Sequence, residues 1–591
     1  MDIIKPATQR KSTMRCYICK ATSKDFNKVE TSQGVDLNNP KFGLSVLHAM
    51  IRFFETLLHL SYKITVQKWQ IKLQTDKEIV NQRQKEIQKK FRTQLGLIVD
   101  VPTVTNDGNI SRRFFEKPQI SSEITGIDLR GNQEDFNRWA KMLKDPSWRY
   151  ENVLRYFKKS EDFHKTNPDA VVDWYYHGKG GYLRTTYDLP SSNNYTKIFI
   201  EANQELGINL TDYNGKKEEG ATILQKHTKQ GRRLDQASAF IKPVTKRTNL
   251  YVLDSSYVIK IEINNKTNRT TGVLFTKNNS TYRANITKEV IVSAGAIQSP
   301  QLLMLSGIGP KEHLQRMNIS LIKDLDVGST LREHVFCGVQ FSSKLDVPQK
   351  GFTQQIKDYL QGYGPLSAAN RIDGAGFYVT KIGEDYNYTD IEIVMSSSTA
   401  SELGKRFLAY SDETWNAMFN FTINNPFTLT TVLLRSRSVG TIRLNTSNPY
   451  DYPLIDFNLL SDAYNKDIET MYEGIQFAIN LTKTGAFKRF SPVLAVRPLP
   501  ACLTHTFLSK QFWYCYIRHI SSAAYHPVGT CPTGINPKKG AVVNGNLQVF
   551  GVERLRIADA SVFPFAFAGQ PNAACTMIGE KISDVIKHQH K

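Results

Sequence analysis

The segment Glu289-Val290-Ile291-Val292-Ser293-Ala294-Gly295-Ala296 decides the fold class of this chain. Its run of branched apolar residues is typical of a buried strand, and Ala294-Gly295 predicts a tight turn directly after that strand. A helix is expected next, over residues 299–305, and Ser306-Gly307-Ile308-Gly309-Pro310 ends it. A buried strand that turns into a helix in this way indicates an α/β protein.

Helical patterns precede and follow this segment. Amphipathic helices are predicted over residues 135–144 and 150–157, and a third over 195–206 that Gly207 is placed to cap. A last helix is expected over residues 572–587. The first two helices are expected to bury four large side chains: Trp139, Leu143, Leu154 and Phe157.

Strand patterns lie between the helices. Alternation with period two predicts strands over residues 250–253, 258–263 and 272–275. No internal repeat or low-complexity tract interrupts the chain. The mixture of helices and strands is compatible with an α/β or an α+β organisation.

The size and charge of the chain narrow its functional class. With 591 residues, 40% of them hydrophobic, it is long enough for two or more domains. Its formal net charge of +21 raises nucleic acid or an anionic membrane as partners. Apart from the basic stretch 63–92, however, lysines and arginines are scattered, and no helix-turn-helix, zinc-finger or RNA-binding motif accompanies them. We therefore expect no nucleic-acid partner.

The seven cysteines predict one disulfide and no metal site. Cys16 and Cys19 form a single Cys-x-x-Cys, and neither a second pair nor histidines at ligand spacing follow it. Cys502 and Cys515 flank the aromatic residues 512–514 and are candidates for a local disulfide.

Glycosylation motifs favour a secreted protein. Residues 1–30 nevertheless lack the apolar core of a signal peptide, and residues 44–60 predict an amphipathic helix rather than a membrane span. No transmembrane segment is expected elsewhere, so secretion is predicted without a clear signal peptide in this sequence. The Asn-x-Ser/Thr motifs begin at Asn109, Asn194, Asn209, Asn265, Asn268, Asn278, Asn279, Asn285, Asn318, Asn387, Asn420, Asn445 and Asn480.

Six segments, in one order along the chain, carry a resemblance to a known family. In order and spacing they resemble the glucose–methanol–choline (GMC) oxidoreductases, within them the insect glucose-dehydrogenase-like branch, from about residue 121 to the end. The segments are Arg130-Gly131-Asn132-Gln133-Glu134-Asp135-Phe136-Asn137-Arg138-Trp139, Tyr156-Phe157-Lys158-Lys159-Ser160-Glu161-Asp162, His177-Gly178-Lys179-Gly180-Gly181, residues 293–310, Tyr525-His526-Pro527-Val528-Gly529-Thr530-Cys531 and Leu555-Arg556-Ile557-Ala558-Asp559-Ala560-Ser561.

The resemblance implies an FAD-binding α/β domain interleaved with a sheet-based substrate domain. Residues 1–110 would form an atypical helical region in place of the opening βαβ dinucleotide-binding unit. Residues 111–330 would form the FAD-binding core with interleaved substrate-domain segments. Residues 331–520 would form the substrate-binding domain, and residues 521–591 would return to the FAD domain.

The resemblance also implies the chemistry. A small-molecule alcohol gives hydride to flavin N5 while a histidine takes the hydroxyl proton, and the family's base falls on His526. Histidine suits this task because it titrates near neutrality. The family's second position, usually His or Asn, falls on Gln570, whose amide cannot titrate and stands one methylene further from the backbone than that of asparagine. The electron acceptor stays open.

Cofactor contacts follow from the same resemblance. Asp559 matches the aspartate beside the flavin diphosphate and ribityl chain, and Val258 matches the valine whose backbone meets the adenine. Ala294 falls in the turn near the ADP moiety. The resemblance places four further residues at the FAD: Thr125, Gly126, Ala560 and Pro571.

The sequence departs from the family pattern at three places that bear on FAD. No Gly-x-Gly-x-x-Gly turn occurs in the first hundred residues, although such a turn presents backbone N–H groups to a pyrophosphate. The family's Gly-Gly-Ser-Ser-x-x-Asn reads Gln119-Ile120-Ser121-Ser122-Glu123-Ile124-Thr125. Its Cys-Lys-Met-Gly reads Cys531-Pro532-Thr533-Gly534. The opening βαβ unit is therefore expected to be missing or replaced.

Two hypotheses remain open at this point. The first is an active FAD-dependent alcohol dehydrogenase or oxidase whose opening unit is lost from this sequence through an incomplete gene model. The second is a catalytically impaired or inactive paralogue that keeps the fold and serves as a secreted binding or structural protein. The substitutions at Thr125 and Gln570 favour the second hypothesis, and the intact segment around His526 favours the first.

Overall fold

The computed structural model describes residues 127–187, 195–345, 351–364, 367, 372–383, 388–397, 408, 410–419 and 423–590. The chain divides into two units at residue 121, and every described residue lies in the second. The expectations for residues 1–110, for Cys16 and Cys19, and for Thr125 and Gly126 therefore lie outside the described residues.

The predicted strand, turn and helix are present as β9 (Val290–Val292) and α7 (Gly295–Leu305). Strand β9 pairs in parallel with β20 (Leu555–Ile557), 265 residues later, in the register Leu555 opposite Val290. The expectation of a buried strand is wrong for Ile291, which is 43% exposed. Alternate residues of a strand face opposite sides, and within the described chain only the Val292 side is covered by core.

A three-stranded antiparallel sheet precedes β9 in sequence. It consists of β6 (Tyr257–Asn264), β7 (Arg269–Lys277) and β8 (Ser280–Asn285), in that order. The predicted strands at 258–263 and 272–275 are confirmed. The strand expected at 250–253 is wrong, because those residues are irregular and Tyr251 is 87% exposed. Their alternation meets no partner strand among the described residues, and a strand without a partner leaves its backbone groups unpaired.

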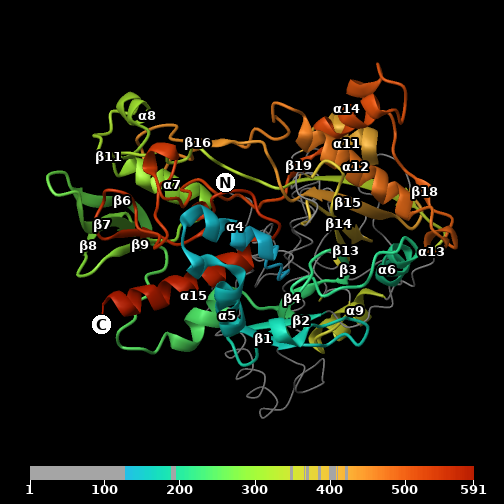
Figure 1. Ribbon diagram of the computed structural model, residues 1–591, viewed down its shortest axis with the longest axis horizontal. Coiled ribbons are helices and arrows are strands. Elements are labelled where there is room, and N and C mark those ends of the chain that lie inside the picture. Colours follow the sequence, from blue (N-terminus) through green and yellow to red (C-terminus); the bar gives the residue numbers. More distant parts are fainter. Residues whose placement is uncertain are drawn as a thin grey trace, which may run out of the picture. The chain divides into compact units, whose positions relative to one another are not determined.

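The largest sheet is built mainly from the second half of the chain, with β3 added from the first half. Its strand order is β18-β12-β15-β14-β13-β3, with β19 also paired to β12. Helices α6, α12 and α14 pack against it (Figure 1). Its strands are β3 (Gly220–Ile223), β12 (Val335–Ser342), β13 (Ile372–Tyr378), β14 (Ile391–Ser396), β15 (Phe427–Leu433), β18 (Val493–Leu494) and β19 (Ser522–Ala523). Its helices are α6 (Tyr195–Glu205), α12 (Lys466–Leu481) and α14 (Lys510–Ile520). Gly207 follows α6 in the left-handed conformation, as predicted.

Smaller elements complete the described structure. A four-stranded sheet joins β1 (Glu161–His164), β2 (Leu183–Tyr187), β4 (Gln225–Lys229) and β5 (Arg232–Arg233). Two short pairs are β10 (Ile308–Gly309) with β11 (Lys323–Asp324), and β16 (Thr441–Arg443) with β17 (Leu454–Asp456). The remaining helices are α8 (Lys311–Arg316), α9 (Phe352–Leu360), α11 (Asp412–Phe419) and α13 (Gly485–Lys488). None of the helices in the described ranges combines the length and the apolar character that crossing a bilayer requires.

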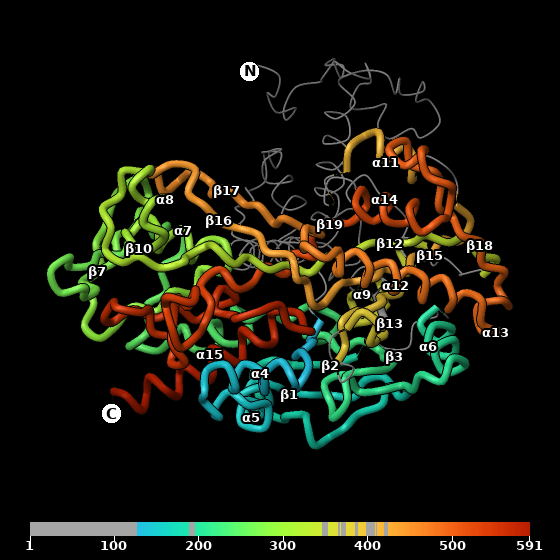
Figure 2. The backbone as a smooth tube through the Cα atoms, turned by 45° about the horizontal axis from the view of Figure 1, so that its top comes forward, coloured from blue at the N-terminus to red at the C-terminus, as the bar shows by residue number. Residues whose placement is uncertain are grey.

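The predicted helices at 135–144, 150–157 and 572–587 are confirmed as α4 (Gln133–Leu143), α5 (Tyr150–Ser160) and α15 (Pro571–Gln589). Helix α15 runs beside α5, close to α4 (Figure 2). The side chains expected to be inside are buried, and Trp139 stacks on Trp148 with ring centroids 4.5 Å apart. Stacked aromatic rings of this size bury much apolar surface at once.

The two largest hydrophobic cores of the described residues follow the chain in an interleaved way. The first collects buried residues from 136–157, 261–331 and 528–582, with Ile442 and Leu444 added from a distant segment. The second collects residues from 335–345 and 378–520, with four residues of α6 added. Each core is continuous within itself, as expected for two structural domains built from alternating stretches of one chain.

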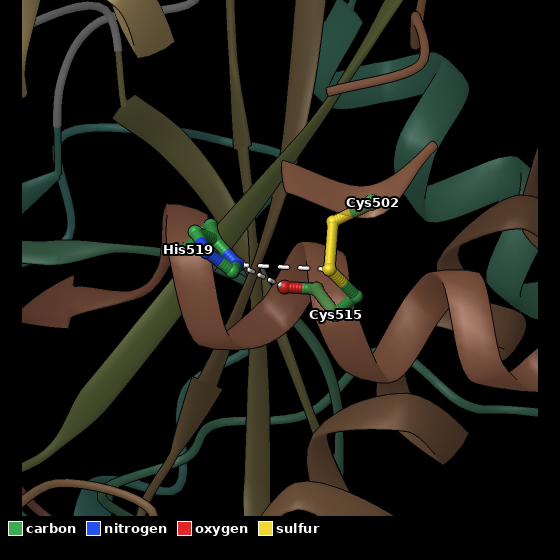
Figure 3. A group of neighbouring side chains, drawn as sticks. All are labelled: Cys502, Cys515 and His519. Atoms are coloured by element: carbon green, nitrogen blue, oxygen red, sulfur yellow. Dashed lines mark hydrogen bonds between the residues drawn. A yellow bond between two sulfur atoms is a disulfide. The ribbon is translucent and has the colours of Figure 1, made fainter. Parts of the chain in front are cut away.

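The predicted disulfide between Cys502 and Cys515 is confirmed, with the two Cα atoms 5.8 Å apart (Figure 3). It ties the 3₁₀ turn Pro500–Cys502 to α14. His519 lies one helical turn further and donates from Nδ1 to the Cys515 carbonyl at 2.9 Å. Both sulfurs are committed to the disulfide, so this cluster offers no thiolate ligands to a metal.

A buried network of charges links β1 to the loops beside it. The guanidinium of Arg130 lies 2.7 Å from Glu161, and His177 lies between two carboxylates. Its Nδ1 is 3.1 Å from Glu161 and its Nε2 is 2.8 Å from Asp212. Burial opposes a charge on His177, but the bonds to Asp212 and Glu161 outweigh it and raise the pKa of the imidazole. Only the protonated ring can donate to both carboxylates.

We expect His177→Gln to destabilise the fold by about 3–5 kcal/mol, because it leaves two buried carboxylates without their shared donor. The folded-state pKa of His177 is raised, so its contribution is complete below the unfolded value of about 6.5 and disappears as pH rises through the folded value. Thermal unfolding from about pH 5 to pH 8 should show a difference between wild type and variant that shrinks with pH. The control is His164→Gln on β1, the strand that carries Glu161, where a half-exposed pair with Asp162 should cost about 1 kcal/mol or less. An equal loss at every pH would contradict the charge on His177.

Candidate functional site

Asp559 joins the end of β20 to the turn after β9. Its Oδ2 accepts from the Gly295 backbone at 2.9 Å and from the Ser299 hydroxyl. Its Oδ1 accepts from both the backbone and the hydroxyl of Ser561, at 2.8 Å and 2.6 Å. The side chain is buried, and four donors satisfy it. Asp559 therefore brings the carboxyl ends of the two parallel strands together, which is where open α/β sheets bind ligands.

The turn at Ala294 and Gly295 leaves room at the start of α7. Gly295 has φ +85°, and a Cβ added to it would meet no atom within 4 Å. Ala294 caps the helix without a side-chain hydrogen bond. The N–H of Gly295 donates to Asp559 and the N–H of Ala294 donates to the Ser299 hydroxyl at 3.1 Å, so both groups of the turn are engaged. Helix N-termini attract negatively charged groups such as phosphate, and the open space lies in front of this one.

The predicted cofactor residues fall into two groups. Ala294, Asp559 and Ala560 lie together, because Asp559 bonds the α7 turn and Ala560 opens the short 3₁₀ helix Ala560–Val562. Val258 lies in β6 opposite Phe275, is 40% exposed and takes no part in those hydrogen bonds. Pro571 is the first residue of α15, directly after Gln570.

The segment that carries His526 is attached to the same place by three hydrogen bonds. The backbone N–H groups of Gly529 and Cys531 donate to the carbonyls of Ala560 at 3.0 Å and Ser561 at 2.7 Å. The Thr530 hydroxyl donates to the Ala296 carbonyl at 2.6 Å. The predicted base and the turn at the start of α7 are therefore parts of one rigid assembly.

His526 contacts a second histidine that the sequence did not single out. Its Nδ1 lies 3.1 Å from Nδ1 of His334, and the two rings are nearly perpendicular at 89°. His334 is buried, and its Nε2 lies 2.9 Å from the carbonyl oxygen of Phe567. Burial and the neighbouring His334 lower the pKa of His526, so its imidazole is neutral at neutral pH.

Glu333 holds the backbones of both histidines. Its Oε1 accepts from the His526 N–H at 2.7 Å and from the His334 N–H at 2.9 Å. Burial raises the pKa of this carboxyl to about 8 against the opposing effect of the two N–H groups. The adjacent acid and histidine at the start of an apolar strand, Glu333-His334, were the signal in the sequence that could have found them.

The predicted second residue, Gln570, sits in a segment that is packed backbone to backbone. A Cβ on Gly569 would come within 2.7 Å of the Gly131 backbone, and one on Gly131 within 2.8 Å of the Phe567 ring. Asp135 of α4 accepts from the Ala568 N–H at 2.8 Å. The segment 567–570 is thus held against α4. The carbonyl oxygen of Phe567 accepts a hydrogen bond from Nε2 of His334.

A cavity of about 870 Å³ lies near this segment. Its lining includes Phe565 and four arginines, Arg138, Arg332, Arg435 and Arg437, which gives it a positive charge. Neither His526 nor Gln570 contributes to its wall, so the cavity is not assigned to the chemistry at His526.

Comparison with known proteins places the chain in one family. The family model described as GMC oxidoreductase matches residues 125–336 with its N-terminal part and residues 436–579 with its C-terminal part. The chain is 33% identical over 465 residues to "Glucose dehydrogenase [FAD, quinone]" of Drosophila pseudoobscura pseudoobscura, covering 78% of this chain and 72% of that protein.

Two further similarities extend this finding. The chain is 30% identical over 497 residues to "Oxygen-dependent choline dehydrogenase" of Rhizobium johnstonii, covering 81% of this chain and 84% of that protein. Its structure is similar to pyridoxine 4-oxidase from Mesorbium loti, with a TM-score of 0.63 at 22% identity over 78% of this chain and 82% of that one. At this identity the structural likeness concerns the fold alone.

The close approach at Gly569 predicts a steric effect that a matched substitution lacks. Gly569→Ala should destabilise the fold by about 1–3 kcal/mol, because backbone atoms must move to admit the methyl group. Gly579→Ala, in α15 with no atom within 4 Å of the new Cβ, should be neutral or stabilising by up to about 1 kcal/mol. Midpoints of thermal unfolding measure both, and a Gly569→Ala protein as stable as wild type would sink the packing argument.

Proposed function

This chain belongs to the GMC oxidoreductase family, and on that premise we propose that it is an FAD-dependent oxidoreductase acting on the CH–OH group of a small-molecule alcohol. The observation that carries the proposal is the attachment of His526 to the turn at the start of α7. A neutral imidazole and a site suited to a dinucleotide are thereby held in one assembly.

Among the described residues, those around the turn before α7 are suited to hold FAD. The turn at Ala294 and Gly295 leaves open space in front of α7, and Asp559 and Ala560 lie beside it. Pro571 begins the helix after Gln570. Thr125, Gly126 and Val258 remain predicted contacts. When bound, FAD supplies the acceptor for the hydride of the alcohol.

In the proposed reaction His526 takes the hydroxyl proton. Its pKa is lowered by burial and by His334, which keeps the ring unprotonated and able to accept. Gln570 is proposed to donate its amide N–H to the alcohol oxygen and so orient it. This role of Gln570 is supported by its position three residues after Phe567, whose carbonyl oxygen contacts His334.

We propose that the division of the chain follows the two cores. Residues 111–330 and 521–591 would form the FAD domain, and residues 331–520 the substrate domain, with α6 and β16 as interleaved segments. The boundaries near 331 and 521 are supported by the change from one core to the other.

The decisive experiment measures flavin and turnover in the purified chain. We expect the visible absorbance of oxidised flavin, retained in His526→Asn, and a fall in kcat of about 10²–10⁴-fold in that variant, because general base catalysis is lost. The control is His519→Asn on α14, an exposed ring that contacts the disulfide. Candidate donors include glucose, choline and simple alcohols, with oxygen and a quinone as acceptors. Gln570→Ala in the same assay tests the second residue.

Two results would contradict the proposal in different ways. Turnover by His526→Asn at the wild-type rate would remove His526 as the base. A protein that stays colourless with added FAD would exclude flavin chemistry for this chain and favour a non-catalytic binding role.

We further propose that the chain is secreted and glycosylated. Nearly all asparagines of the predicted motifs that are described are exposed: Asn209, Asn265, Asn278, Asn279, Asn285, Asn318, Asn445 and Asn480, with Asn268 half-buried. The disulfide between Cys502 and Cys515 is of the kind that persists in oxidising compartments.

Expression in a secreting eukaryotic cell should yield a protein whose mass falls on treatment with an amidase that removes N-linked glycans. Peptide mapping should find deamidated asparagine at the exposed positions, above all around β7 and β8, because the folded protein can carry a bulky, hydrated glycan only on its surface. A secreted protein with no mass change would contradict glycosylation.

A further inference from the structure

Two hydrogen-bond contacts in a row, both made by the ring of His334, connect the main chain at Phe567 to the ring of His526. The carbonyl oxygen of Phe567 lies 2.9 Å from Nε2 of His334, and Nδ1 of His334 lies 3.1 Å from Nδ1 of His526. A carbonyl oxygen can only accept, so Nε2 of His334 carries a proton. The short contact between the two Nδ1 atoms holds one further proton, and its position decides which nitrogen of His526 is free.

The state of His334 decides that position. A protonated His334 would donate from Nδ1 and leave the proton of a neutral His526 on its own Nε2. A neutral His334 has a lone pair on Nδ1 and must accept from His526. His334 is only 3% exposed, and burial lowers its pKa to about 4, helped by the nearby positive charge of Arg435 and opposed by the carbonyls of Phe567 and Leu434. At neutral pH His334 is therefore the acceptor.

We propose that His334 is a positioning residue that holds His526 in the tautomer protonated at Nδ1, so that Nε2 is the unprotonated atom that receives the proton of the alcohol. Only the statement that Nε2 receives the proton of the alcohol rests on the proposed function. In that step the O–H bond of the alcohol breaks, a new N–H bond forms at Nε2 and the electron pair of the O–H bond stays on oxygen. Among the described residues, no hydrogen-bond partner occupies Nε2 of His526.

The backbone keeps the two rings in contact independently of their protons. Arg332 and Val528 exchange two backbone hydrogen bonds of 2.9 Å, and the Ala524 N–H donates to the His334 carbonyl at 2.9 Å. Val335 at the start of β12 then pairs with Ala523 at the end of β19. Glu333 adds its bonds to both histidine N–H groups. These backbone hydrogen bonds fix the strand register on both sides of the two histidines, so the rings stay in contact whatever their protonation. His334 therefore controls the tautomer of His526 and not the contact itself.

Two substitutions at His334 distinguish a packing role from a role in setting the tautomer of His526. Leucine would fill much of the volume but offers no acceptor to His526. Asparagine places its Oδ1 close to where Nδ1 of histidine stands and so keeps an acceptor there. The pair His334→Leu and His334→Asn therefore separates packing from tautomer control.

The test is magic-angle-spinning NMR of the protein labelled with ¹³C and ¹⁵N in its histidines, with the His526 signals identified by their loss in His526→Gln. We expect His526 in the wild type to be protonated at Nδ1 and His334 at Nε2. In His334→Leu the His526 ring should change to the Nε2–H form or to a mixture, and in His334→Asn it should return to Nδ1–H. A wild-type His526 protonated at Nε2, or an unchanged tautomer in His334→Leu, would overturn the proposal. The wild-type spectrum alone decides it if the variants fail to fold.

Turnover gives the second readout. We expect kcat to fall by about 10²-fold or more in His334→Leu and to recover largely in His334→Asn, because a base in the wrong tautomer cannot accept a proton. Equal losses in both variants would contradict tautomer control. If the spectra are as expected and no alcohol is oxidised by any form of the protein, the proposed function fails while the tautomer assignment stands.

Discussion

The buried carboxylate of Asp559 is the interaction on which the arrangement of the site depends. It joins the end of β20, the turn before α7 and the 3₁₀ helix Ala560–Val562. Four donors converge on this side chain, and the bonds are removed from solvent. The segments so joined are far apart in sequence: α7 begins 264 residues before Asp559. The 3₁₀ helix that Asp559 caps supplies the Ala560 and Ser561 carbonyls to which the His526 segment is bonded.

A second constraint acts on the histidines themselves. Two stretches of backbone run antiparallel on either side of them, and each stretch contributes one ring. The rings meet because hydrogen bonds fix the register of the main chain, and their protonation follows from burial and from a single carbonyl group. The site thus obtains a defined proton arrangement from its main chain. In water the same two rings would exchange protons freely, since histidine titrates close to neutral pH.

Local patterns predicted much of this structure. The strand and helix around Ala294, the helices α4, α5 and α15, and the Cys502–Cys515 disulfide all have causes within a short stretch of sequence. Residues 250–253 show where local patterns fail: alternation of apolar residues predicts a strand, but it does not tell whether a partner strand is present to pair with it. Ile291 shows it again, because burial on a second face depends on what else covers the sheet.

The adjacent Glu333 and His334 were visible in the sequence, but their contact with His526 was not. His334 is 192 residues away, and the contact exists only because β12 and β19 pair in one particular register. The motif around His526 identified the residue, while its electrostatic surroundings come from Glu333, His334 and a carbonyl that no local pattern distinguishes. The resemblance to a family supplied roles for Asp559 and Ala560, and the structure adds the hydrogen bonds that bring them together.

Strand β8 is an outer strand of its sheet, and all six of its residues are exposed. An edge of this kind offers unpaired N–H and C=O groups to any other extended chain, and proteins usually protect it with charges, proline or a bulge. Here Asn278 and Asn279 stand in the turn that enters the strand and Asn285 ends it. If those asparagines carry oligosaccharides, as proposed, the sugars would be bulky, hydrated barriers along the edge and would keep two copies from joining their sheets and aggregating.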